Sequence, residues 1–103
     1  MLRELLDKMY QDAFMRANVP QRRKLNRGLH LTLTCHAQGV TLTLSRDSQT
    51  PSMGEWQTCL NNFPYFTGKI VPRKAMIDGR QALIGELPSR AQVAEQMRLD
   101  QLR

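Results

Sequence analysis

A length of 103 residues, a hydrophobic share of 41% and a formal net charge of +6 describe one small basic domain, which we place at residues 1–103. No apolar run approaches the roughly 20 residues that a membrane-spanning helix needs, which excludes a membrane segment. Glu4 and Asp7 lie where a secretion signal would need its apolar core, so we expect a cytoplasmic protein whose cysteines, Cys35 and Cys59, are reduced.

The first predicted element is an amphipathic helix of about 16 residues, because apolar residues recur at spacings of three and four. Asn18 and Pro20 end it. Its apolar stripe is broader than one sheet face would cover, so we also expect this helix to be the surface of a homodimer. The stripe consists of Leu2, Leu5, Leu6, Met9, Tyr10, Phe14 and the alanines Ala13 and Ala17.

Residues 20–28 form a polar, basic connection, after which the period of the apolar residues changes to two. From Leu29 to Ser45 leucines alternate with threonines and histidines, which predicts a β-hairpin with one apolar and one polar face. With a turn at Gln38 and Gly39, Thr34 would oppose Thr43 and Leu33 would oppose Leu44. We expect helices on the leucine face and solvent or a partner on the threonine face.

A second helix is predicted after Pro51, since Ser52 and Glu55 have the spacing of a capping box. It places Met53, Trp56, Leu60 and Phe63 on one face, with Cys59 beside it. Residues 69–77 and 80–87 then flank Asp78-Gly79, a dipeptide suited to a tight hairpin turn. A last helix follows Pro88-Ser89, with Val93, Ala94 and Met97 expected to point inward.

The order of these elements is α-β-β-α-β-β-α. Such an order predicts an α+β fold, in which two β-hairpins form an antiparallel sheet covered on one face by helices.

The positive charge is unevenly distributed, which makes an anionic partner the leading functional hypothesis. Residues 13–46 carry six bases and no acid, whereas residues 1–12 sum to −1 and residues 47–103 to +1. Clustered arginine and lysine neutralise phosphates, and threonine hydroxyls can hydrogen-bond to a nucleic-acid backbone. We therefore predict a nucleic-acid interface on a basic connection and a polar sheet face. The predicted contacts are Arg22, Arg23, Lys24, Arg27, Arg46, Lys69, Arg73, Lys74 and Arg80.

Tyr65 and Phe66 are the aromatic side chains available to stack on bases, and no established nucleic-acid-binding signature is present. Two alternatives therefore remain open. One is a protein-interaction or assembly subunit. The other is a small ribonuclease of the toxin type, with His36, Thr41 and Arg46 or Arg22 around the phosphate.

No motif for a cofactor or metal is present, so we expect neither, and we favour a binding protein over an enzyme. His30 and His36 lie six residues apart on one strand, which separates them by about 20 Å. That distance is too long for two ligands of one zinc ion. Cys59 beside a core face is expected to be a buried structural thiol.

Overall fold

The computed structural model describes residues 2–37, 39–63, 69–88 and 90–102. It confirms the α+β class, with three helices and one five-stranded antiparallel sheet in the order β1-β2-β3-β5-β4. The elements are α1 (Leu2–Met15), β1 (Gln21–Lys24), a short 3-10 turn (Asn26–Gly28), β2 (Leu29–His36), β3 (Gly39–Arg46), α2 (Met53–Asn61), β4 (Arg73–Ile77), β5 (Arg80–Leu87) and α3 (Arg90–Gln101).

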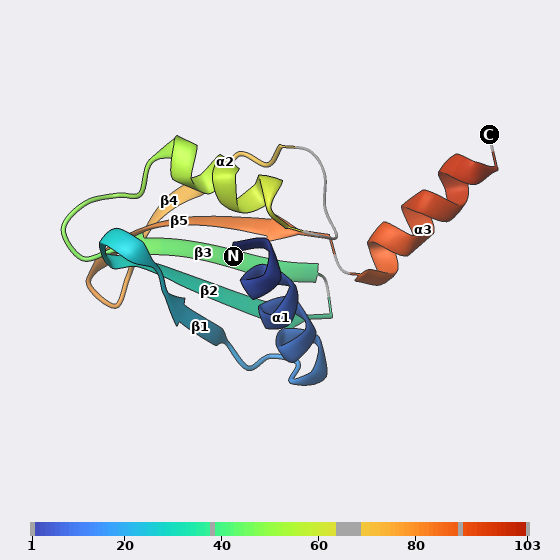
Figure 1. Ribbon diagram of the computed structural model, residues 1–103, viewed down its shortest axis with the longest axis horizontal. Coiled ribbons are helices and arrows are strands. Elements are labelled where there is room, and N and C mark those ends of the chain that lie inside the picture. The colour runs from blue at the N-terminus through green and yellow to red at the C-terminus, as the bar shows by residue number, and fades with distance from the viewer. Residues whose placement is uncertain (1, 38, 64–68, 89, 103) are drawn as a thin grey trace.

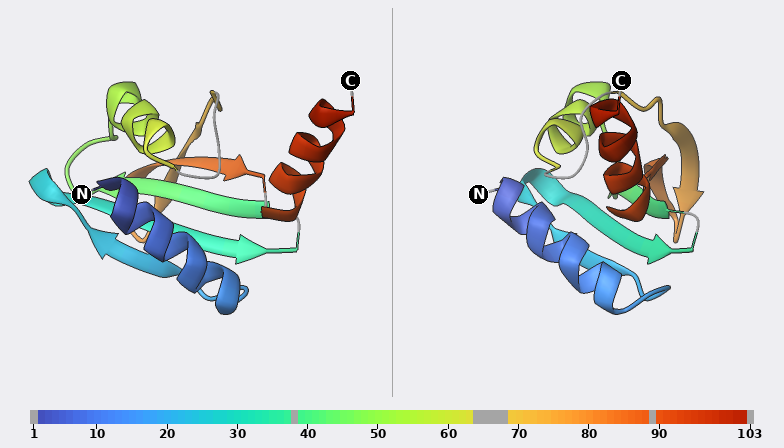
Figure 2. Two further views of the ribbon diagram at one scale, coloured as in Figure 1. Left: turned by 45° about the vertical axis from the view of Figure 1, so that its right-hand side comes forward. Right: turned by 90° about the vertical axis from the view of Figure 1, so that its right-hand side faces the viewer.

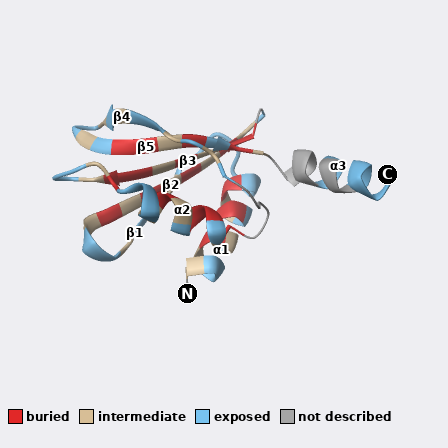
Figure 3. Cartoon of the chain, turned by 90° about the horizontal axis from the view of Figure 1, so that it is seen from above, coloured by how far each residue is buried: buried red, intermediate tan, exposed pale blue. Residues whose placement is uncertain are grey.

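Helices α1 and α2 lie on one side of the sheet (Figure 1; Figure 3). The leucine face of the sheet and these two helices together form the core, as alternation along the strands predicted. Tyr10 of α1 and Phe63, just after α2, bring the two helices together through an edge-to-face contact with ring centroids 5.3 Å apart. The buried core includes Leu6, Met9, Tyr10, Ala13, Leu31, Leu33, Val40, Leu42, Leu44, Trp56, Cys59, Leu60 and Phe63.

Helix α2 begins with the predicted capping box. Ser52 Oγ accepts a hydrogen bond from the Glu55 amide at 3.1 Å, and the Glu55 carboxylate accepts one from the Ser52 amide at 3.0 Å. Trp56, Cys59 and Leu60 are buried. Met53 was predicted to share their core face but is 55% exposed. Met53 is the first helical residue, where the chain has only begun to approach the sheet.

The basic connection predicted over residues 20–28 contains an edge strand. Gln21 to Lys24 pair with β2 through Gln21↔Leu33 and Lys24↔His30, and a tight turn at residues 25–28 joins the two strands. The side chains of β1 are mostly exposed, and its sequence accordingly has no alternation of apolar and polar residues. Charged side chains are common on such edges, where they discourage pairing with other chains.

The register predicted for the first hairpin is wrong by two residues. Thr34 pairs with Thr41 and Leu33 with Leu42, and the hairpin closes with His36 opposite Gly39. A slip of two residues leaves every side chain on the same face, so polarity could not distinguish the registers. The second hairpin has the predicted register, with Ile77 opposite Arg80 and positive φ at Asp78 and Gly79.

The last helix was predicted to pack on the core. Helix α3 instead extends away from the end of the sheet (Figure 1; Figure 2). Ala94 is exposed, and the side chains of Val93 and Met97 lie outside the part that the structure describes. The leucine face is already covered by α1 and α2, and the sequence of α3 is dominated by polar residues. A polar helix therefore has little apolar surface with which to compete for that face.

Candidate nucleic-acid interface

The sheet face opposite α1 and α2 is not covered by a helix within the described ranges (Figure 3). The registers align its side chains in rows across all five strands. One row runs from Arg22 on β1 through Thr32, Thr43 and Ile84 to Arg73 on β4. Each row therefore begins on one sheet edge and ends on the other. The row from Arg22 to Arg73 has a base at both ends.

The neighbouring row adds a third base and a histidine to this open face. It runs from Lys24 on β1 through His30, Ser45 and Ala82 to Ala75 on β4. The side chains that follow Ser45 in this row are both alanines and rise little above the sheet.

A groove of about 340 Å³ occupies this part of the open face. Its lining joins the first strand to the hairpin of β4 and β5, which lies at the other side of the sheet. The lining residues are Pro20, Arg22, Arg23, Lys24, His30, Leu31, Thr32, Thr43, Ser45, Ile77, Asp78 and Arg80. A concave surface with bases on both sides and hydroxyls between them suits an anionic chain lying along it.

The structure brings four of the nine predicted contacts together on the open face. Arg22 and Lys24 come from β1, Arg73 from β4 and Arg80 from β5. Arg22, Lys24 and Arg73 are exposed, and Arg80 is partly exposed beside its ion-pair partner Asp47. These four residues, which we call the open-face bases, came from two separate clusters in the sequence.

Alternation along the strands gives two other predicted contacts the parity of the leucine face, although Arg23, on the edge strand, also lines the groove. Arg23 occupies the β1 position opposite Leu31, and Lys74 the β4 position opposite Leu83, so both have the parity of the leucine face. Lys69 lies before β4 in a segment without regular structure and is exposed. These three bases therefore add to the general positive field of the chain without belonging to the rows of the open face.

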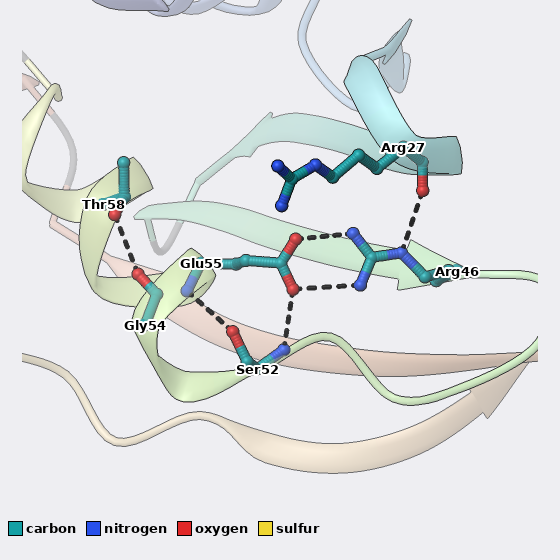
Figure 4. Close-up of polar contacts among 6 residues, drawn as sticks. All are labelled: Arg27, Arg46, Ser52, Gly54, Glu55 and Thr58. Carbon is teal, nitrogen blue, oxygen red and sulfur yellow. Dashed lines mark hydrogen bonds and ion pairs between the residues drawn. The ribbon is translucent and has the colours of Figure 1, made fainter.

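Arg46 is held in a structural contact on the leucine face. Its guanidinium donates two hydrogen bonds to the Glu55 carboxylate, at 3.0 Å from Nη1 and 2.5 Å from Nη2 (Figure 4). Arg46 Nε also donates to the Arg27 carbonyl oxygen at 3.1 Å. Bidentate pairing of this kind is strong, so Arg46 ties β3 to the start of α2 and is not available to a ligand on the open face.

The same contact changes the ionisation of Glu55. Hydrogen bonding to Arg46, followed by the hydrogen bond from the Ser52 amide, lowers the pKa of Glu55 from 4.5 to about 2. Arg27, which has φ of +62°, lines a second hollow with Arg46 and Glu55 on this side of the molecule. Because Glu55 neutralises Arg46, that hollow has only one base in excess.

The residues proposed for ribonuclease chemistry are only partly brought together. His36 Nε2 lies 3.0 Å from Thr41 Oγ1, but the third group beside them is Glu86, whose carboxylate lies 3.2 Å from the same nitrogen. Arg46 is on the other face, and Arg22 belongs to the row of Thr32 and Thr43. An acid therefore stands where a transferring phosphate would need a positive charge.

The thiols and histidines form no metal site in the described part of the chain, where no three His, Cys, Asp or Glu side chains converge. Cys35 and Cys59 are both free and buried. Burial raises the pKa of Cys35, and burial followed by the charge of Glu55 raises the pKa of Cys59 to about 11. Both thiols are therefore protonated near neutral pH, which makes them poor nucleophiles.

Sequence reasoning placed His30 on the polar face but gave it no role in a binding site, and it missed Asp47 and Glu86 as members of the open face. The positions of these two acids follow from the pairing of β3 with β5, which places Thr41 opposite Glu86 and continues past Arg46↔Gln81 to Asp47 and Arg80. Each strand pattern was visible, but nothing in the sequence specified which strands of the two hairpins meet. Tyr65 and Phe66, the predicted stacking residues, lie outside the described residues.

No model of a known protein family, no curated protein and no solved structure matches this chain. Among the described residues, no helix is both long and apolar enough to span a membrane.

Proposed function

We propose that this protein binds the phosphate backbone of a nucleic acid on its open sheet face. The observation that carries the proposal is a hydroxyl-lined groove with Arg22 and Lys24 on one side and Arg80 on the other, while Arg73 lies at the far end of the row of Arg22. The hydroxyls of Thr32, Thr43 and Ser45 have no hydrogen-bond partner among the described residues and are available to the oxygens of a nucleic-acid backbone.

The same face favours contact with the backbone over reading of bases. Its described side chains include no Phe, Tyr or Trp, since Tyr10, Trp56 and Phe63 are buried and Phe14 belongs to α1. Stacking on aromatic side chains is the usual means of holding single-stranded bases. We therefore infer binding that depends strongly on salt and weakly on sequence.

The test is a fluorescence-anisotropy titration of short single- and double-stranded DNA and RNA at several salt concentrations. The variant Arg22→Ala/Lys24→Ala removes two open-face bases, and the slope of log K against log salt should become shallower by about 2. The control Lys8→Ala/Arg16→Ala removes the same charge from exposed positions in and after α1. Equal losses in both variants would mean that affinity reflects net charge alone, which would contradict the proposal.

A protein-interaction role is the second candidate, favoured by a group of exposed apolar side chains at the end of α1. Phe14, Met15 and Val19 are 54%, 83% and 48% exposed. The rest of the stripe is used within the chain, because Leu6, Met9 and Tyr10 are buried and Leu2 and Leu5 pack against the core. A homodimer through this end of α1 would appear as a concentration-dependent mass that Phe14→Ser abolishes.

A further inference from the structure

Asp47 is an acidic residue at one end of the basic groove. The register of β3 and β5 brings it opposite Arg80, and Arg80 Nε donates to Asp47 Oδ1 at 2.5 Å. The side chain of Asp47 is 69% exposed and that of Arg80 is 41% exposed. An ion pair so accessible to water is weak, so an anion of similar shape can replace the carboxylate.

His30 is the second group that faces the Asp47 carboxylate. Its Nε2 lies 3.8 Å from Asp47 Oδ1, which is too long for a hydrogen bond. That nitrogen is buried and has no hydrogen-bond partner among the described residues, although the side chain as a whole is 21% exposed. A buried polar atom without a partner is unfavourable, which points to a ligand that can reach it.

The charges around His30 come from three sides of the groove. Lys24 of β1 is its direct cross-strand neighbour, and Arg22 lies one row away on the same strand. Arg80 of β5 and Asp47 lie on the other side, with Asp78 at the turn before β5. Arg80 therefore contacts the Asp47 carboxylate directly, while Lys24 and Arg22 line the same groove beside His30.

We propose that this position is a subsite for one backbone phosphate, formed by Arg80 and His30 and filled by Asp47 in the free protein. On binding, a phosphate oxygen replaces the Asp47 carboxylate and accepts the hydrogen bond from Arg80 Nε. His30 Nε2 donates to a second oxygen, in the tautomer that carries its proton on this nitrogen. The inference rests on the proposed function, since it assigns a specific contact within the nucleic-acid groove.

The test compares Asp47→Asn with Asp78→Asn in the same oligonucleotide titration. Both variants remove one negative charge, Asp78 from the groove lining and Asp47 from beside Arg80, and asparagine suits the positive φ of residue 78. Asp78 forms no ion pair within the described part of the chain, whereas Asp47→Asn removes the carboxylate that competes with the phosphate for Arg80. Asp47→Asn should therefore bind several-fold more tightly than Asp78→Asn at the same salt concentration, because a phosphate no longer has to displace a carboxylate from Arg80.

A second comparison tests the role of His30 in binding the phosphate. In the Asp47→Asn background, His30→Ala should weaken binding several-fold, whereas His36→Ala, at the far end of the open face, should not. If the wild-type protein binds nucleic acid but Asp47→Asn raises the affinity no more than Asp78→Asn does, the proposed subsite is wrong and the proposed function stands. If neither the wild-type protein nor Asp47→Asn binds DNA or RNA at low salt, the proposed function fails and the subsite with it.

Discussion

Gly85 on β5 lies against the indole ring of Trp56, and this contact sets how closely α2 approaches the sheet. A Cβ atom added at residue 85 would lie 2.6 Å from Trp56 Cζ2, 2.8 Å from Cη2 and 3.4 Å from Ile70 Cγ2. Carbon atoms in good contact are about 3.5–4.0 Å apart, so the ring would have to retreat by about 1 Å. Trp56 is fully buried, and its Nε1 donates to the Ile70 carbonyl oxygen at 2.8 Å, so the ring has little freedom to move.

We therefore expect Gly85→Ala to lower the free energy of unfolding by about 3 kcal/mol, at the upper end of the range for overpacked cores. In a domain of this size each kcal/mol lowers Tm by roughly 4–8 °C, so the loss would be about 12–24 °C. Urea and thermal unfolding followed by circular dichroism would measure both quantities.

Gly54→Ala is the matched control for this experiment. A Cβ atom at Gly54 would have only an ordinary contact, 3.7 Å from Ser52 Oγ, and the residue lies in the first turn of α2. Alanine there should raise stability by about 0.4–1 kcal/mol through the unfolded state. A Gly85→Ala variant within about 0.5 kcal/mol of the wild-type protein would refute the reasoning, because it would show that Trp56 yields easily.

Two further predictions concern ionisable groups on the other side of the sheet. The folded-state pKa of Glu55 is lowered from 4.5 to about 2, so its contribution to stability is complete above pH 4.5 and is lost as the pH falls toward 2. Glu55→Gln should lower the free energy of unfolding by about 1–3 kcal/mol at pH 7, and this difference should narrow toward pH 2 in urea titrations. A difference independent of pH would contradict the role of the carboxylate. Because burial raises the pKa of Cys59 to about 11, and Cys35 is also buried, neither thiol should react with a disulfide reagent at pH 8 until denaturant is added. Rapid labelling of the native protein would show that α2 opens readily.

Much of the fold could be predicted from the sequence because local residue patterns specify its helices, strands and turns. Apolar residues at period two predicted the leucine face, and the capping box predicted where α2 begins. Asp78-Gly79 predicted the second hairpin with its register, because the turn itself specifies the pairing. Strand β1 was missed because a polar edge strand has no apolar pattern to detect.

The site was less predictable than the fold, because it depends on which strands become neighbours. The sequence showed two basic clusters, but only the order β1-β2-β3-β5-β4 brings Arg22 and Arg73 to the ends of one row. The same order pairs Asp47 with Arg80 across 33 residues of sequence. From the sequence, Arg46 was predicted to be available to a ligand, because Glu55 was already assigned a role in capping α2. The Glu55 carboxylate in fact accepts hydrogen bonds from both the Ser52 amide and the Arg46 guanidinium.

Placing a negative charge at the centre of the open face tests the central claim most directly. Thr43→Glu adds a carboxylate to the groove, and Thr58→Glu adds the same charge to an exposed position on α2. We expect Thr43→Glu to lose at least tenfold in affinity for an oligonucleotide of about 12 nucleotides, a length that matches common single-strand sites. Thr58→Glu should bind as the wild-type protein does, and thermal unfolding would confirm that both variants are folded. Equal affinities of the two folded variants would show that nucleic acid does not bind on the open sheet face.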